Sequence, residues 1–260
     1  MAEYQGIAER QPNAVPPLPE PQRLSADRGW HWIMDAFRLV KPYFGVWFLL
    51  CLIFIIIMMV LSAVPAGSFV WMLLQPILGA GLMFACSELE RGEEPEIGHL
   101  FIGFQRNPTQ LALLGLIACV ASIAIILIAA IPFLMMGGFQ NMSMFLANPG
   151  APMTPVFSSA LVALLLFLII LLVLWMPLTM AMWFATALVL FDNLPAWPAF
   201  KISYRGCMAN LMPFLVFGLI GMVLCVVAAM PLGLGLFLLV PVLFATGYTS
   251  YRDVFGAEPL

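Results

Sequence analysis

Residues 44–64 read FGVWFLLCLIFIIIMMVLSAV, an apolar run that contains no charged residue. At a rise of about 1.5 Å per residue, about 20 helical residues cross a hydrocarbon core about 30 Å thick. Each central Leu, Ile, Phe or Val favours insertion by about 0.3 to 0.6 kcal/mol. The run therefore predicts a transmembrane helix.

The composition of the whole chain agrees with a membrane environment. Of the 260 residues, 63% are hydrophobic and 9% are charged, and the mean hydropathy is +1.06. Soluble domains are about 45–50% apolar and about 25% charged, which argues against a soluble fold. A membrane β-barrel would show alternating segments of about ten residues, whereas this chain has long unbroken apolar runs. We predict an all-α, polytopic membrane protein.

Five further apolar runs follow the first one, so we expect six transmembrane helices that pair into three hairpins. Their approximate bounds are 44–64, 69–87, 111–136, 156–191, 211–230 and 234–250. A Pro-rich segment precedes them, and its composition is typical of disorder. The predicted divisions are a disordered cytoplasmic tail at 1–24, a transmembrane domain at 25–255 and a cytoplasmic tail at 251–260.

The run 156–191 is longer than one span requires, and it contains Pro177. Two structures fit it: two short spans, or one long helix with a kink at the proline. Two spans would leave a second piece of about 14 residues, which is short for a bilayer. They would also move Lys201 and Arg205 away from the other basic residues. One helix kinked near Pro177 is therefore favoured.

The basic residues all fall on one side of such a topology. The ten Lys and Arg lie in the N-terminal region, in the loops 88–107 and 192–210, and near the C-terminus. With six spans these four segments share one side, and the positive-inside rule makes that side cytoplasmic. We predict a protein of the bacterial cytoplasmic (inner) membrane with both termini in the cytoplasm.

Each hairpin is preceded by a short amphipathic stretch whose apolar residues recur with the spacing of one helical face. These stretches lie at about 30–38, 97–106 and 200–211. They predict an internal repeat, an interfacial helix followed by a hairpin, with the short helices at the cytoplasmic headgroup level. The three repeats cover about 28–92, 95–192 and 196–252.

Two segments of the sequence are similar to a known family. Residues 199–214, AFKISYRGCMANLMPF, and residues 90–95, ERGEEP, which precede Leu100-Phe101, resemble an uncharacterised family of six-span proteobacterial inner-membrane proteins, a domain of unknown function. The resemblance covers about residues 28–255 and leaves the Pro-rich tail outside. It implies a six-span inner-membrane protein, and it assigns neither an activity nor a catalytic residue.

Gln75 is the most polar side chain near the centre of a span, and Pro76 follows it. A proline inside a helix frees a backbone carbonyl one turn earlier. Gln75 then marks either a helix break that lines a site or a kink that the Gln75 side chain repairs with a hydrogen bond. A water-filled cavity near the midplane, lined by Gln75, Thr179 or Thr186, would favour transport, and a fully packed bundle would oppose it.

Lys201 and Arg205 are four residues apart, so they share one face of the third amphipathic stretch. Together with Asn210 they are candidates for contact with a lipid headgroup or with the acidic patch of a partner. The alternative is that these basic residues only set the topology.

No pattern in the sequence indicates catalysis. The histidines, His31 and His99, have no cysteine or carboxylate cluster at ligand spacing, so no metal site is predicted. No phosphate loop, nucleophile elbow or cofactor motif is present. We expect a non-enzymatic protein that needs no cofactor and acts through membrane lipids, another membrane protein or a second copy of itself, and not through nucleic acid. The alternative is a small transporter or channel for an apolar or zwitterionic solute.

Reporter fusions test the predicted topology. Fusions after Ser68, Gly150 and Pro231 are expected to give extracytoplasmic signals, because each position lies between two spans of one hairpin. A fusion after Leu260 is the control and should report the cytoplasm. A cytoplasmic signal at Gly150 would contradict the predicted topology.

Overall fold

A computed structural model describes residues 19–147 and 155–256, and within these ranges the fold is helical, without strands. The prediction of an all-α protein is confirmed. Residues 1–18 of the predicted N-terminal tail and residues 257–260 lie outside the described residues. The helices are α1 Arg28–Val40, η1 Lys41–Tyr43, α2 Phe44–Ser62, α3 Gly67–Glu90, η2 Ile97–Phe104, α4 Pro108–Met135, α5 Gly138–Ala147, α6 Pro155–Trp183, α7 Ala185–Phe191, α8 Ala196–Ala209, α9 Leu211–Ala229 and α10 Leu234–Phe255.

Six helices in the described ranges are long and apolar enough to cross a membrane, which confirms the predicted number. They are α2 (continuous with α1), α3, α4, the α6–α7 unit, α9 and α10. Residue chemistry accounts for several of their ends. Pro108 opens α4, a position where its missing N–H costs nothing. Gly233, at a φ of +80°, makes the turn before α10, where most residues would be strained.

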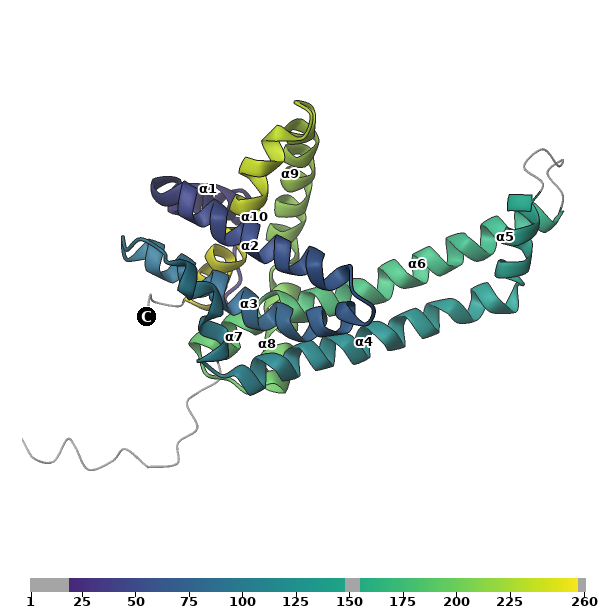
Figure 1. Ribbon diagram of the computed structural model, residues 1–260, viewed down its shortest axis with the longest axis horizontal. Helices are drawn as coiled ribbons and strands as arrows, with labels where there is room; N and C mark the ends of the chain where they lie inside the picture. The colour runs from purple at the N-terminus through teal and green to yellow at the C-terminus, as the bar shows by residue number, and fades with distance from the viewer. Residues whose placement is uncertain (1–18, 148–154, 257–260) are drawn as a thin grey trace, which may run out of the picture.

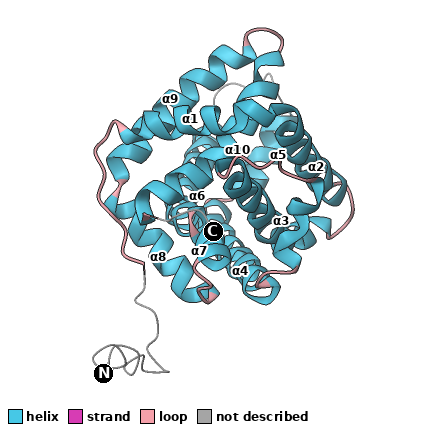
Figure 2. Ribbon diagram, turned by 90° about the vertical axis from the view of Figure 1, so that its left-hand side faces the viewer, coloured by secondary structure: helices cyan, strands magenta, loops and turns pink. Residues whose placement is uncertain are grey.

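Among the membrane-crossing helices, α2 packs against α3, α3 also packs against α4, α4 packs against α6, and α9 packs against α10. The arrangement of the six helices as three hairpins stays a prediction, and α4–α6 and α9–α10 are two of the pairs in contact. Figure 1 shows that the α4–α6 pair and the α9–α10 pair leave one end of the molecule in different directions. We call that end the base, and it holds α1, η2, α7, α8 and the C-terminal half of α10. Seen from the base, α10 lies near the middle with other helices around it (Figure 2).

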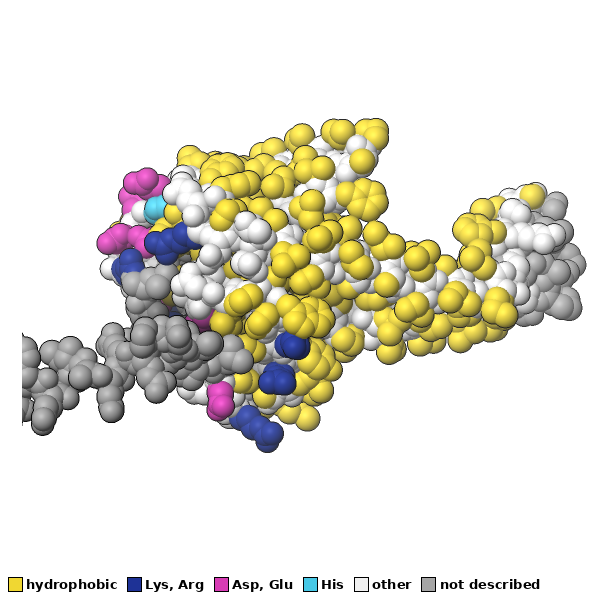
Figure 3. All heavy atoms as spheres, turned by 90° about the horizontal axis from the view of Figure 1, so that it is seen from below, with side chains coloured by type: hydrophobic (Ala, Val, Ile, Leu, Met, Phe, Trp, Pro, Cys, Tyr) yellow, Lys and Arg dark blue, Asp and Glu magenta, His cyan; other side chains and the backbone are white. Residues whose placement is uncertain are grey.

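Charge and hydrophobicity are segregated over the surface. Figure 3 shows acidic, basic and histidine side chains toward the base, with hydrophobic side chains covering most of the remaining face in view. Helix α9 illustrates the second kind of surface, since Pro213 and Gly221 are its only buried residues. Such a helix needs lipid or another apolar partner along its length.

The regular helix across 156–191 is interrupted at Phe184, between α6 and α7, and not at Pro177. Helix α6 continues through Pro177, and the predicted bend at that proline stays a prediction. The hydroxyl of Ser203, from α8, accepts a hydrogen bond from the Phe184 N–H (2.9 Å) and donates one to the Met180 carbonyl (2.8 Å). A side chain inserted in this way replaces the usual bond between these two backbone groups and breaks the helix.

Helices lie at all three predicted amphipathic stretches, namely α1, η2 and α8. The second differs from the expectation, because η2 is a 3₁₀ helix with tighter winding. The position of these helices at a membrane surface stays a prediction.

Both ends of the described chain are more ordered than the predicted tails. Helix α10 continues to Phe255, and Val254 is fully buried. The backbone N–H of Gln22 donates to the Val254 carbonyl (2.8 Å), and the N–H of Leu24 donates to Asn210 Oδ1 (2.8 Å). Residues 19–24 therefore pack onto the base.

Helix α3 packs closely against η2, and two glycines make this possible. A Cβ atom added at Gly81 would lie 2.1 Å from the Leu100 carbonyl oxygen, and one added at Gly103 would lie 2.1 Å from the Ile77 carbonyl oxygen. Neither neighbour can move easily, because both are backbone atoms of helices. Small residues at such crossings are common in membrane proteins.

The substitution Gly81→Ala is expected to lower the melting temperature in detergent, by a loss of about 1–3 kcal/mol, because its methyl group would overlap the η2 backbone. Gly218→Ala is the matched control, since nothing lies within 4 Å of its added Cβ. Alanine should leave stability unchanged there or raise it slightly through helix propensity. Equal melting temperatures for the two variants would contradict the close packing of α3 on η2.

Candidate functional site

The three helix pairs meet around a pocket of about 360 Å³, which we call the central pocket. Each pair contributes a wall, from α3, from the α6–α7 unit and from α10, and Phe54 of α2 completes it. The residues that line it are Phe54, Gln75, Gly79, Leu82, Met83, Thr179, Met182, Trp183, Thr186, Leu243, Phe244 and Gly247.

The spacing of the lining residues reflects helix geometry. On α6 and α7 they recur at Thr179, Met182, Trp183 and Thr186, which is one face of a helix continued across the break at Phe184. The same i, i+3, i+4, i+7 pattern was visible in the sequence. Because the whole region is apolar, nothing marked this face as the one that turns inward.

Two polar groups of the pocket lack partners. Among the described residues, neither the Gln75 amide nor the Thr186 hydroxyl makes a hydrogen bond. Gln75 is exposed and Thr186 is 8% exposed, so both groups are reached through the pocket and neither is a fully enclosed polar atom. Thr179 differs, because its hydroxyl donates to the Met176 carbonyl of its own helix (2.8 Å). An unpaired amide or hydroxyl is costly in an apolar environment, so these two groups favour a guest that can hydrogen-bond.

Neither a break in α3 nor a hydrogen bond from Gln75 to its own helix is present at this position. Helix α3 runs through Pro76 without interruption, and Gln75 does not bond to the backbone carbonyl that the proline frees. That carbonyl, on Met72, instead faces Gly115 of α4, where an added Cβ would lie 2.4 Å from the oxygen. The Gln75 side chain is thereby left to the pocket, which it lines together with Thr179 and Thr186.

A smaller pocket of about 230 Å³ lies on the other side of Trp183, between α6, α8 and α9. Thr179 and Trp183 line both pockets. The indole N–H of Trp183 donates to the hydroxyl of Ser250 in α10 (3.1 Å), which holds the ring between them. The two pockets thus lie on either side of the Trp183 ring.

Polar contacts tie the helices together beneath the central pocket. Asp253 accepts two hydrogen bonds from Arg28 (2.7 and 2.8 Å) and one from the Trp32 indole (2.8 Å). The Tyr251 hydroxyl donates to Asp192 (2.7 Å). A second set of contacts joins three more residues: Glu90 accepts a hydrogen bond from the Tyr248 hydroxyl (2.7 Å) and forms an ion pair with Arg252. We call all of these residues together the base cluster.

The central pocket does not continue into the base cluster. On α3, α7 and α10, the residues that come after the pocket lining in the sequence are buried. They lie between the central pocket and the charged groups of the base cluster. These residues include Ser87, Leu190 and Ser250. The pocket is therefore closed toward the base.

The predicted contact residues Lys201, Arg205 and Asn210 are not together. Lys201 and Arg205 lie on the exposed face of α8, beside a groove of about 500 Å³. Asn210 is buried, and its side chain is used within the protein. It accepts from the Leu24 N–H and donates to the carbonyls of Gln22 (2.8 Å) and Gly206 (3.0 Å). Asn210 thus holds the segment that precedes α1.

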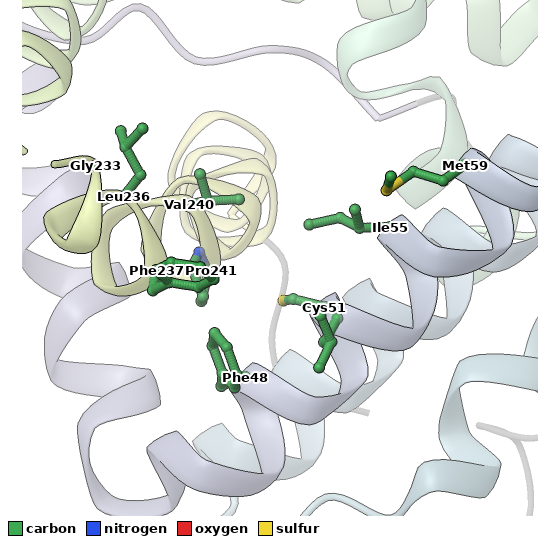
Figure 4. A pocket seen from close by; sticks show the side chains of 10 residues that line it. Phe48, Cys51, Ile55, Met59, Gly233, Leu236, Phe237, Val240 and Pro241 are labelled. Atoms are coloured by element: carbon green, nitrogen blue, oxygen red, sulfur yellow. The ribbon is translucent and has the colours of Figure 1, made fainter. Parts of the chain in front are cut away.

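A further groove of about 380 Å³ lies between α2 and α10. Figure 4 shows Phe48, Cys51 and Ile55 of α2 across from Phe237 and Val240 of α10. The described residues that line this groove are apolar. Such a groove suits a hydrocarbon chain, and these lining side chains offer no polar group that could bind a headgroup.

Comparison with known proteins identifies one family. A family model described as "Predicted integral membrane protein (DUF2189)" matches residues 64–156, which contain α3, η2, α4 and α5. The resemblance to an uncharacterised membrane-protein family is confirmed over these residues. With its six apolar helices, the chain is an integral membrane protein. No match was found among curated proteins or among solved structures.

The Tyr251–Asp192 contact predicts a difference between two variants. Tyr251→Phe removes the donor and leaves the Asp192 carboxylate half-buried without it, so we expect a loss of about 1–3 kcal/mol in stability. Asp192→Asn keeps an acceptor and removes a charge, so its melting temperature should equal or exceed that of the wild type. An equal loss in both variants would contradict this role of the tyrosine.

The Asp192 carboxyl should also make the stability of the protein depend on pH. Burial raises the pKa of Asp192, and the hydrogen bond from Tyr251 acts in the opposite direction. The folded protein therefore holds this proton more tightly than the unfolded chain. The resulting stabilisation is complete below the unfolded pKa and is lost as the pH rises through the folded pKa. Melting temperatures measured from about pH 3 to 7 should fall more in the wild type than in Asp192→Asn, because other carboxyls, Glu88 among them, titrate in both proteins.

Proposed function

We propose that the protein binds a neutral amphipathic lipid in the central pocket and acts without catalysing a reaction. The observation that carries this proposal is the pair of unpartnered polar groups, the Gln75 amide and the Thr186 hydroxyl, in an otherwise apolar wall. Together they offer both hydrogen-bond donors and acceptors at one place in the pocket, where the Gln75 side chain is exposed and Thr186 is buried.

The lining chemistry selects the class of ligand. The described residues around the central pocket carry no charge, so a charged headgroup would be left without a counter-ion. A hydroxyl, ester or carbonyl group would pair with Gln75 and Thr186 while hydrocarbon contacts Phe54, Leu82 and Phe244. The volume of about 360 Å³ is within the usual range of small-molecule sites and suits the polar end of a lipid.

We propose that such a lipid reaches the pocket laterally, from the bilayer. Helices α6 and α9 expose large apolar side chains, among them Leu172, Leu219 and Met222. Inside a bilayer, lipid chains reach such a surface without passing through water. Membrane lipids are therefore the first partners that we propose, before another membrane protein or a second copy of the chain.

We propose that the base faces the cytoplasm of a bacterial inner membrane, with both termini on that side. The distribution of the ten Lys and Arg residues supports this orientation. The central pocket would then be closed toward the cytoplasm and would open within the bilayer.

Transport of an apolar or zwitterionic solute is a second candidate. The observation that favours it is the place of the central pocket, where three helix pairs meet above a closed base. Transporters also bind substrate between helix bundles and close one side at a time. For this chain, passage would require the base cluster to open.

Lipid retention tests the binding proposal. The full-length protein is reconstituted with a photoactivatable diacylglycerol analogue, which has a neutral hydroxyl and ester head, and crosslinking is measured by mass spectrometry. The double variant Gln75→Leu/Thr186→Val should lose about tenfold in crosslinking, which corresponds to about 1.4 kcal/mol. Crosslinked peptides from the wild type should come from α3, α7 or α10.

The control for this experiment is Gln105→Leu/Thr109→Val, which makes the same chemical changes at exposed positions outside the central pocket. Equal crosslinking in wild type, variant and control would contradict the proposed site. Solute flux into sealed vesicles that the Gln75→Leu/Thr186→Val variant abolishes would favour transport.

A further inference from the structure

We infer that Lys201 and Arg205 form a second, separate lipid site, one that binds the phosphate of an anionic phospholipid at the surface of α8. A groove of about 500 Å³ lies beside them. Ala121 of α4 and Leu178 and Ala181 of α6 form its apolar wall, and Lys201, Tyr204 and Arg205 of α8 form its rim.

The two cations are not neutralised by any described carboxylate. Arg28, Arg38, Arg91 and Arg252 each lie within ion-pair distance of one, whereas Lys41 and Arg106 also make no ion pair with a described residue but do not line the groove. Among the described residues, neither Lys201 nor Arg205 makes an ion pair. Lys201 lies 5.4 Å from the centre of the Trp197 ring, a contact that fixes the ammonium and leaves its N–H groups free to donate.

The arrangement matches an anion that is attached to hydrocarbon. Lys201 and Arg205 are one helical turn apart, close enough to share one phosphate through charge-assisted hydrogen bonds. The Tyr204 hydroxyl is a further donor on the same exposed face. The apolar wall beside them, formed by membrane-crossing helices, would hold an acyl chain, which a free phosphate ion lacks. We therefore assign the ligand as an anionic phospholipid and not as a soluble anion or an acidic protein.

This site is independent of the central pocket. It shares no lining residue with it, and it recognises a charge that the central pocket would reject. Binding at one site can therefore fail while binding at the other persists.

Native mass spectrometry of the full-length protein with phosphatidylglycerol and phosphatidylethanolamine tests the inference. The wild type should retain phosphatidylglycerol in preference to phosphatidylethanolamine. The double variant K201Q/R205Q should lose about tenfold in phosphatidylglycerol retention, since each basic residue near a membrane surface adds appreciable affinity for anionic lipid. The charge-conserving variant K201R/R205K should retain most of the preference.

The matched control is K41Q/R106Q, which removes two exposed positive charges that do not line the groove. It should keep the preference for phosphatidylglycerol. An equal loss in this control would show that net charge alone binds the lipid and would overturn the site. Displacement of phosphatidylglycerol by millimolar inorganic phosphate would overturn the lipid assignment, and an unchanged preference in K201Q/R205Q would overturn the inference as a whole.

Discussion

The carboxylate of Asp253, held by Arg28 and Trp32, joins α10 to α1 and thus the last described helix to the first. In a bilayer, lipid chains are as apolar as leucine, so helices gain little from hydrophobic contact with one another. Polar contacts and close backbone packing must then hold a bundle together. In this chain the base cluster supplies polar contacts at the base, and the glycines of α3 and η2 add close packing there. Close backbone packing also occurs farther along, at Gly115 between α4 and α3 and at Gly235 between α10 and α9.

Above the base the helix pairs are free to diverge, and they do (Figure 1). The central pocket lies between α3, the α6–α7 unit and α10, next to the base where these helices are tied together. Gln75 and Thr186 line this pocket without partners among the described residues. A bundle selected only for packing would place leucine or valine at both positions, because an unpaired amide in hydrocarbon is unfavourable.

Local features of the fold could be predicted from the sequence, and features that depend on distant residues could not. Span number follows from run length and hydropathy, which are local. The break at Phe184 depends on Ser203, nineteen residues later in the chain. The sequence around Phe184 contains no local signal for a break, whereas Pro177 is a local signal for a kink. The residues 251–255 read as a polar tail, because Asp253 is recognisable as a structural group only beside Arg28. Asn210 was grouped with Lys201 and Arg205 by proximity in sequence, whereas it turns inward to residues 22–24. Gln75, Thr179 and Thr186 were identified by polarity alone, and their meeting in one pocket required the fold.

An experimental structure in lipid nanodiscs would show directly whether a lipid completes the central pocket. We expect diverging helix pairs, with elongated density between α3, α7 and α10 whose polar end lies within hydrogen-bond distance of both Gln75 and Thr186. Helix pairs that do not diverge, with Gln75 hydrogen-bonded to a group of the protein itself, would contradict a lipid in this pocket.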